Sequence, residues 1–399
     1  MILQRTLPCG PWAVDSLIAN PRQTLYVSRT MEPSVKTLRL VRLLFLLPVA
    51  CCSAGCNLSA YSTDPLNWLD LALGQLEYLK AAVPIEQLLA DPDLPQDLRE
   101  RLELAVDARR FAVEQGLSDG PSYRTYVDTL GLPAAWNVTA SPRTALFALS
   151  FLYPFAGSFP YAGFFDRADA EAFAEGFRAE GFDAHVAGAA AYSTLGIFPD
   201  PVYSSMLEGS RAFLVETILH EKMHETIFAA DRAYNEALAS YAGRYGSLLY
   251  FETRFADRPE VLQRVRGEFA DRDVWESLTA FLRTEMDAYY TAARAAGLSE
   301  AQILAGRDGA WTGALQRVEQ EFLPRFEFPN DWRGVLSWEL NNARSLYWEL
   351  YNSRYELFDA VRVKAGGTLA SALPVFRAAG EAADPFAWLE TWMAARAAD

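Results

Sequence analysis

Hydrophobic residues recur at intervals of three and four positions over most of the chain after residue 65. This spacing is clear at residues 66–82, stops at Asp91 and Pro92, and resumes at residues 94–115. Apolar side chains at this spacing share one face of a helix, and that face is buried when the helix packs. The pattern therefore predicts amphipathic helices along this part of the chain.

The pattern changes between about residues 134 and 200. Short apolar runs at 134–140, 144–153 and 160–165 indicate strands, residues 166–181 have helical spacing, and residues 182–196 again indicate a strand. Helical spacing then returns and continues to the C-terminus. We therefore predict an α+β fold that is predominantly α-helical, with a small mixed sheet ahead of a helix near residues 210–228.

Residues 36–56 have the pattern of a bacterial export signal. Lys36, Arg39 and Arg42 precede an apolar run at residues 43–50, which is short for a membrane span. Small residues then lead to Cys56, and this ending is similar to a lipobox. We therefore predict that Cys56 is lipidated and anchors the protein to a membrane.

Two details of this leader stay open. Ser53 stands where a lipobox usually has leucine, so Cys51 and Cys52 are alternative acceptors, and a plain cleaved signal or a single-pass anchor is the alternative to a lipoprotein. Met31 lies at a normal distance before the signal, so we interpret residues 1–30 as an extension from gene calling. In each case we expect residues 56–399 to form one domain in the bacterial cell envelope, facing the periplasm or exterior.

Charge and cysteine content limit the chemistry of the chain. The formal net charge is −15, which argues against nucleic acid as a partner because phosphate binding needs a basic surface. All four cysteines lie within the first 56 residues (Cys9, Cys51, Cys52, Cys56). A metal site in the remaining chain must therefore use histidine and carboxylate ligands.

Residues 220–224 read HEKMH and contain two of the three histidines of the chain. Positions i and i+4 lie on one helix face, so His220 and His224 can bind the same ion. Glu221 lies about 100° around the helix from His220 and can act on a water that this ion activates. This motif predicts a catalytic zinc site.

A catalytic zinc usually has three protein ligands and keeps a further position for water or substrate. A second helix is expected to begin near residues 231–234, with Glu236 about one turn inside it. If the two helices, which span about residues 208–256, form an antiparallel hairpin, Glu236 meets the same ion as the two histidines. The rival third ligand is His185, which alternates with apolar residues on a predicted strand.

The sequence at 220–243 resembles the zinc segment of the bacterial predicted aminopeptidases, a family of lipoprotein-like zinc metallopeptidases. The resemblance extends over most of residues 56–360 and includes the segments 73–79 (LGQLEYL), 84–102, 160–174 (PYAGFFDRADAEAFA), 191–206 and 340–344 (LNNAR). It implies His220, His224 and Glu236 as zinc ligands and Glu221 as the catalytic carboxylate.

Residues 235–239 (NEALA) also resemble the glutamate helix of the larger gluzincin aminopeptidases, which implies a zincin-like fold. The spacing differs, because only 11 residues separate His224 from Glu236. Lys222 and Met223 also stand where small or apolar residues are common in the family. Neither difference changes a ligand.

The expected reaction is zinc-dependent hydrolysis of a peptide bond. Glu221 would take a proton from water and deliver it to the leaving amine, and a further group should stabilise the developing oxyanion. Tyr351 is our choice for that group, although packing on an amphipathic helix is the simpler explanation of this tyrosine. Residues 191–196 (AYSTLG) are a candidate edge strand for binding a peptide substrate.

The sequence leaves the type of peptidase open. An aminopeptidase needs an anionic pocket for the free amine, and Asp200 and Glu208 are acidic candidates near the motif. An endopeptidase is equally compatible with the zinc motif. The alternative from another class is a non-catalytic envelope lipoprotein with a structural or vestigial zinc site, although a structural zinc needs no adjacent base such as Glu221.

Overall fold

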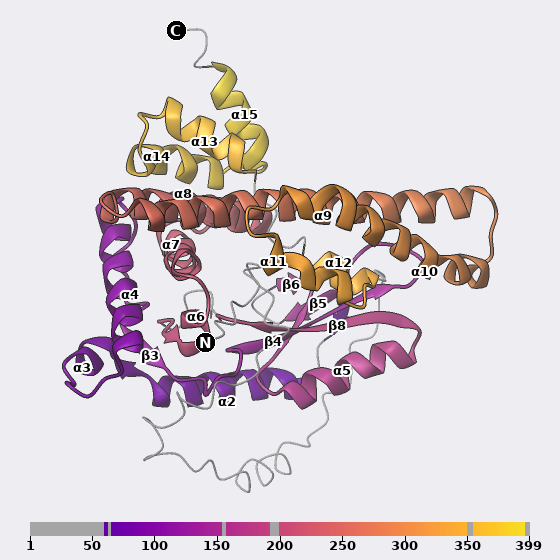
Figure 1. Cartoon of the computed structure of the whole chain (residues 1–399), viewed down its shortest axis with the longest axis horizontal. Helices are drawn as coiled ribbons and strands as arrows, with labels where there is room; N and C mark the ends of the chain where they lie inside the picture. Colours follow the sequence, from indigo (N-terminus) through magenta and orange to yellow (C-terminus); the bar gives the residue numbers. More distant parts are fainter. Residues whose placement is uncertain (1–59, 63–64, 154–156, 192–198, 349–353, 396–399) are drawn as a thin grey trace, which may run out of the picture.

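The computed structural model describes residues 60–62, 65–153, 157–191, 199–348 and 354–395. Helices make up most of these residues, and the strands are short (Figure 1). The prediction of an α+β fold that is predominantly α-helical is confirmed. Cys56 and Tyr351 lie outside the described residues, as does most of the predicted edge strand at 191–196.

The described strands form three separate three-stranded sheets, where the sequence pattern predicts one. The longest pairing is antiparallel, between β4 (Ala135–Pro142) and β8 (Phe182–Ala189), with β7 (Ala162–Phe164) on the other side of β4. Helix α5 (Arg167–Ala179) packs on this sheet and buries phenylalanine and alanine side chains against it. The helix ends before Gly181, whose φ of +88° suits glycine at a helix C-terminus.

The other two sheets are smaller. In the first, β5 (Ser150–Tyr153) pairs with β1 (Ala60–Ser62) and with β6 (Gly157–Phe159). In the second, β3 (Thr125–Val127) pairs with β2 (Val83–Pro84) and, in parallel, with β9 (Val202–Tyr203). Segments far apart in the sequence therefore meet just before helix α6 (Ser204–Leu207), which leads into the helices of the HEKMH motif.

The largest core lies around helices α4 (Gln96–Glu114), α7 (Arg211–Thr226) and α8 (Arg232–Arg254), with α2 (Pro65–Ala81) and α3 (Ile85–Leu89) at its edge. Figure 1 shows α7 on one side of α8 and the C-terminal helices on the other. These are α13 (Tyr355–Lys364), α14 (Leu369–Gly380) and α15 (Pro385–Ala395). Helix α8 is therefore covered by α7 on one side and by the C-terminal helices on the other.

Two hydrogen bonds join the C-terminal helices to the junction of α7 and α8. The Tyr234 hydroxyl donates to the Phe376 carbonyl at 2.7 Å, and Arg377 donates to the Thr226 carbonyl at 3.0 Å. Gly380 at the end of α14 faces Ala229, and a Cβ atom there would lie 3.0 Å from the Ala229 side chain. The end of α14 therefore packs directly on the loop between α7 and α8.

A second core forms between α9 (Pro259–Ala295) and α10 (Glu300–Arg317), which make a long hairpin. A π-helical turn (Val318–Phe322), two 3-10 turns (Leu323–Arg325 and Arg333–Ser337) and α11 (Pro329–Trp332) then lead to α12 (Asn342–Trp348). Asn342, in the LNNAR segment, accepts a hydrogen bond from Tyr290 at 2.8 Å and donates to the Pro142 carbonyl at 2.8 Å. The LNNAR segment therefore joins the α9–α10 hairpin to the end of β4.

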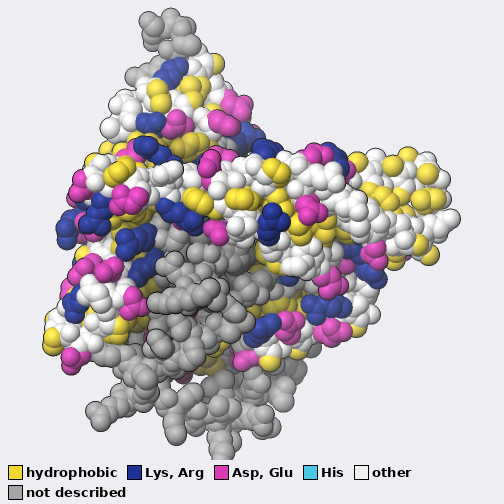
Figure 2. All heavy atoms as spheres, viewed as in Figure 1, with side chains coloured by type: hydrophobic (Ala, Val, Ile, Leu, Met, Phe, Trp, Pro, Cys, Tyr) yellow, Lys and Arg dark blue, Asp and Glu magenta, His cyan; other side chains and the backbone are white. Residues whose placement is uncertain are grey.

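On the face shown in Figure 2, acidic and basic side chains are interspersed over the described surface. Many of them form ion pairs, such as Arg254 with Glu114 at 2.8 Å and Arg266 with Glu252 at 2.7 Å. No helix in the described ranges combines the length and the apolar composition that crossing a bilayer requires.

Candidate metal centre

The two helices of the centre begin at side-chain caps. Ser210 accepts a hydrogen bond from the Phe213 amide at the start of α7, and Asp231 accepts one from the Tyr234 amide at the start of α8. Both residue types are preferred at this position because their oxygen satisfies an amide that has no partner inside the helix. Helix α7 ends at Thr226, and the chain reverses over a short extended segment before α8. The sequence therefore encodes a helix hairpin at this point.

Asn235 fixes the loop of this hairpin. Its side-chain amide donates to the Ala229 carbonyl at 2.5 Å, and its carbonyl oxygen accepts from the Ala229 amide at 2.7 Å. Both polar groups of one loop residue are thus satisfied by one buried side chain, which is how a buried turn avoids unpaired amides. Because Glu236 follows Asn235 directly, this contact also sets the position of Glu236 relative to α7.

Two glycines let α8 approach α7 closely. A Cβ atom on Gly243 would lie 2.8 Å from the Glu216 carbonyl oxygen and 3.1 Å from the His220 Cβ, and one on Gly246 would lie 3.1 Å from Leu219. A Cβ at the first of these distances would force the helices apart, because real Cβ atoms do not approach backbone so closely. The two helices can therefore pack at the distance that places Glu236 beside the histidines.

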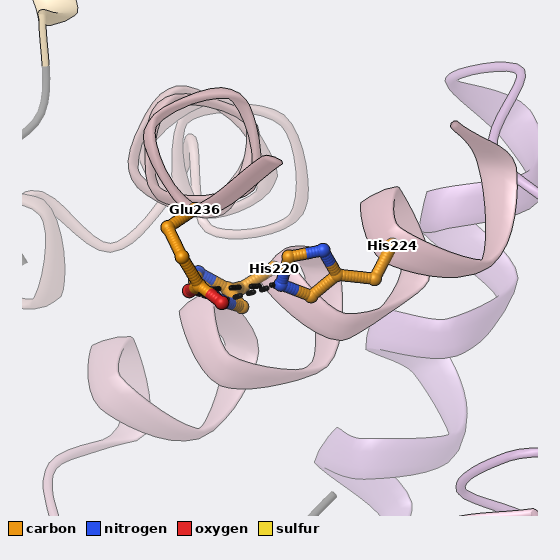
Figure 3. A group of neighbouring side chains, drawn as sticks. All are labelled: His220, His224 and Glu236. Atoms are coloured by element: carbon orange, nitrogen blue, oxygen red, sulfur yellow. Dashed lines mark hydrogen bonds and ion pairs between the residues drawn. The ribbon is translucent and has the colours of Figure 1, made fainter. Parts of the chain in front are cut away.

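His220, His224 and Glu236 converge on one point, the histidines from consecutive turns of α7 and the glutamate from α8 (Figure 3). The His220 Nε2 atom lies 3.2 Å from the His224 Nε2 and 3.6 Å from Glu236 Oε2, and the His224 Nε2 lies 3.8 Å from the same oxygen. Atoms bound tetrahedrally to zinc at about 2 Å lie roughly 3.3 Å from one another. The separations fit one shared ion.

The charges at this centre favour a cation. Burial alone would raise the pKa of the Glu236 carboxyl, but hydrogen bonds and charge interactions with His220 and His224 outweigh it and hold that pKa well below its usual range. Burial would lower the pKa of His220, and Glu236, Glu221 and Glu216 together raise it. The site therefore holds excess negative charge, which a divalent cation can neutralise.

Glu221 lies beside this group on α7 and is half-buried. In the described parts of the chain it has no hydrogen-bond or ion-pair partner. By contrast, Glu216 on the preceding turn forms a half-buried ion pair with Arg272 of α9. Of these two acidic residues on α7, Glu221 is the one available to exchange a proton with a bound molecule.

Comparison with known protein families gives a match over most of the chain. Residues 68–379 match the family described as "Putative aminopeptidase". The chain belongs to this family. The match covers α7, α8 and most of the helices around them. No curated protein and no solved structure matches the chain.

In this aminopeptidase-family chain, Lys222 of the HEKMH motif is fully buried on the side of α7 away from Glu236. Its ammonium group donates to Glu225 at 2.6 Å and to the Gly120 carbonyl at 2.9 Å. The Ser118 amide donates to Thr226 on the same helix at 2.8 Å. Lys222 therefore attaches a loop from the N-terminal half of the chain to helix α7.

His185, the rival third ligand, is not part of the group. It lies on β8, where its Nδ1 accepts a hydrogen bond from Arg344 at 3.3 Å and its ring contacts Tyr347 at a centroid distance of 5.7 Å. Burial, followed by the charges of Arg344 and Arg178, lowers the pKa of His185 to about 3. This histidine is therefore a neutral core residue between the sheet and α12.

The other acidic candidates lie on the segment before α7. Asp200 is buried, and its backbone pairs with Ser122 and Tyr123 of the segment before β3. Glu208 follows α6 and is half-buried, and burial together with the charge of Asp128 raises its pKa. No group of metal-ligating side chains in the described ranges includes either residue.

The structure also brings two tyrosines to the centre that the sequence analysis did not select. Tyr123 is buried and has a φ of +64°, which is an unusual conformation for a bulky residue. Burial, followed by the charge of Glu221, raises the pKa of its hydroxyl well above the ordinary value. Tyr161, in the PYAGFF segment, lies beside Arg232 and is close enough to interact with the charge of Glu236. The resemblance included PYAGFF, but strand periodicity alone gives no reason to single out its tyrosine.

Proposed function

We propose that this protein is a zinc-dependent peptidase and acts as an aminopeptidase. The observation that carries the proposal is the convergence of His220, His224 and Glu236 beside a glutamate with no described partner, Glu221. Three protein ligands of the His₂Glu type are the donor set of catalytic zinc sites, which keep a position for water or substrate. A purely structural zinc is usually bound by four protein ligands. The donor set therefore favours catalysis over a structural role.

We also propose that the site is zincin-like, of the gluzincin type. The HEKMH helix follows small sheets in the sequence, and the third ligand comes from the next helix of a hairpin. Asn235 and Gly243 support this geometry, because the first fixes the loop and the second allows the close approach of the two helices.

The residues of this chain have separate tasks in the proposed reaction. A zinc ion held by His220, His224 and Glu236 would activate water and polarise the carbonyl group of the peptide bond. Glu221 accepts one proton from the attacking water and returns it to the leaving amine, so that peptide and water give a carboxylic acid and an amine. The imidazoles of His220 and His224 are held by α7, and Glu236 is held by Asn235 and the first turn of α8.

The substrate we propose is a peptide, in agreement with the description of the family.

We propose further that the protein works in the cell envelope on a lipid anchor at Cys56. This proposal rests on the export pattern of residues 36–56. Export directed by that signal would place the site outside the cytoplasm.

The test uses the chain from residue 57 onward, zinc analysis and a mixed peptide library. We expect about one zinc per chain and release of N-terminal residues that the variant Glu221→Gln loses by a factor of about a thousand or more, since the general base is removed. Glu252→Gln, on the surface of helix α8 where Glu252 pairs with Arg266 at 2.7 Å, controls for loss of a carboxylate elsewhere in the helix pair. Cleavage inside the peptides would identify an endopeptidase, and stoichiometric zinc without any Glu221-dependent cleavage would favour a non-catalytic lipoprotein.

A further inference from the structure

The turn that carries Tyr161 is attached to the first turn of α8. Arg232, the first residue of α8, donates to the Ser158 carbonyl at 2.9 Å, and its guanidinium carbon lies 3.4 Å from the centre of the Phe159 ring. Arg232 and Glu236 are four residues apart, so both are on the same face of α8. The segment after β6 is therefore held against the face of α8 that supplies the third metal ligand.

Tyr161 belongs to this attached segment. Its ring packs on Phe159 at a centroid distance of 5.8 Å, and its side chain lies beside the guanidinium of Arg232. It is half-buried, so part of the residue is accessible from outside the core. Together these contacts place the Tyr161 ring beside the first turn of α8, one helical turn before Glu236.

Tyr161 also has the protonation state that a hydrogen-bond donor needs. Burial raises the pKa of the Tyr161 hydroxyl to about 12, the charge of Arg232 lowers it, and the charge of Glu236 raises it. The phenol therefore keeps its proton at neutral pH. The positive charge beside it makes the proton a better donor to a negatively charged oxygen, because that charge stabilises electron density on the phenol oxygen.

Arg232 is free to act on Tyr161. In the described parts of the chain, no carboxylate lies within ion-pair distance of its guanidinium, although Glu236 is one turn away. Its positive charge is consequently not neutralised by an acidic partner. Its contacts are a backbone carbonyl, an aromatic ring and the tyrosine.

We propose that the Tyr161 hydroxyl donates a hydrogen bond to the carbonyl oxygen of the peptide bond being cleaved, and that Arg232 positions it. This inference rests on the peptidase function proposed above. In the reaction, water adds to the carbonyl carbon and the carbonyl oxygen gains negative charge, while Glu221 takes the proton of the water. Tyr161 keeps its own proton and shares it with that oxygen, so no further co-reactant is needed.

The test compares Tyr161→Phe with Tyr153→Phe in the zinc-loaded chain from residue 57 onward. Tyr153 is a matched control, because its ring packs on the same Phe159 at 5.4 Å and its hydroxyl is bonded to the Gly163 amide at 2.8 Å. We expect Tyr161→Phe to lower kcat by about a hundredfold with KM within a factor of three, the usual result of removing an oxyanion donor. Tyr153→Phe should leave both constants near the wild-type values.

A second readout measures binding instead of turnover. A phosphinic pseudopeptide imitates the tetrahedral, negatively charged species, and calorimetry should show it binding at least about tenfold more weakly to Tyr161→Phe than to the wild type. Zinc content and the thermal midpoint should be unchanged. Arg232→Gln should also weaken binding of the phosphinic pseudopeptide. Arg232→Lys should weaken it less, because lysine keeps the positive charge.

The outcomes separate this inference from the function on which it rests. A wild-type protein that neither cleaves peptides nor binds the phosphinate overturns both. A wild-type protein that does both, with Tyr161→Phe within threefold of it, overturns the role of Tyr161 alone. Equal losses in Tyr161→Phe and Tyr153→Phe, or loss of zinc in Tyr161→Phe, would show that the tyrosine only supports the fold, and would also overturn the role.

Discussion

Glu236 is the one member of the proposed metal-binding group that does not come from α7. Its pKa is held low by the two histidines, so it is ionised at neutral pH and needs no deprotonation before it binds a cation. The His220 and His224 rings alone would leave two protein ligands on the ion. The affinity for metal should therefore depend strongly on this residue.

Glu236→Gln tests that dependence. Changes to groups that only support a ligand reduce zinc affinity 10–100-fold, so replacing a ligand should reduce it by at least about a hundredfold. Competition with a chromophoric chelator measures the affinity. Glu252→Gln is the matched control, because Glu252 is on the same helix and pairs with Arg266 at 2.7 Å on the surface. Equal affinity of the Glu236 and Glu252 variants would exclude Glu236 as a ligand.

His185 has a different role, in the acid stability of the fold. Its pKa of about 3 in the folded protein lies below the value of about 6.5 in an unfolded chain, so below pH 6.5 the unfolded state binds more protons. The resulting stability is fully present above pH 6.5 and is lost as the pH falls towards 3. At pH 5 the loss is about 2 kcal/mol, at 1.4 kcal/mol per pH unit.

His185→Gln should reduce this loss while its amide oxygen still accepts from Arg344. Denaturant unfolding of both proteins at pH 7 and pH 5 measures the difference, and the carboxylates contribute equally to each. The expected result is a smaller decrease in the free energy of unfolding for the variant. An identical decrease would show that His185 titrates normally.

At the scale of elements, the contact between α7 and α8 depends on Gly243. A methyl group there would meet the Glu216 carbonyl and the His220 Cβ. Gly243→Ala should cost about 1–3 kcal/mol through overpacking and should also weaken zinc binding, because Glu236 moves with α8. Gly309→Ala on α10 is the control, since nothing lies within 4 Å of its added Cβ. That control should be neutral or stabilise by up to about 1 kcal/mol.

Thermal unfolding and a zinc titration distinguish the two glycine variants. If Gly243→Ala binds zinc as tightly as the wild type, the distance between α7 and α8 does not determine zinc binding, whether or not the thermal midpoint changes. A destabilised Gly309→Ala would mean that loss of helical glycine matters by itself.

The helix hairpin of the centre is predictable from the sequence for physical reasons. The caps Ser210 and Asp231 and the apolar spacing are local signals, and the i, i+4 histidines specify one face of a helix. Gly243 and Lys222 act through contacts with distant residues, so their roles have no local signature, whereas Asn235 bonds to Ala229, six positions earlier in the loop between α7 and α8. The strands β2, β3 and β9 are too short to show periodicity, and their pairing joins residues more than 40 positions apart. For this reason the sequence pattern predicts a single sheet, whereas the described strands form three.

At the scale of the whole molecule, a bound ion should stabilise the fold. Ligands that bind the folded state alone add about 2.7 kcal/mol at a hundredfold excess over Kd. Zinc should therefore raise the thermal midpoint and a chelator should lower it, as calorimetry can measure. Glu221→Gln should respond like the wild type, and Glu236→Gln should respond weakly. If zinc does not change the thermal midpoint of the wild-type protein, the proposed zinc site in the folded protein would be excluded.

The contacts of α14 with the α7–α8 loop determine how late in synthesis this part of the chain can finish folding. Tyr234 is bonded to Phe376 and Thr226 to Arg377, which a ribosome adds 142 and 151 residues later. We therefore expect a nascent chain to contain His220, His224 and Glu236 well before the contacts with α14 can fix the helix hairpin that carries them. A chain ended at residue 366 should bind zinc less tightly than the full chain in a chelator competition. Under the proposed peptidase function, such a delay would keep an unfinished chain from cleaving peptides inside the cell that makes it.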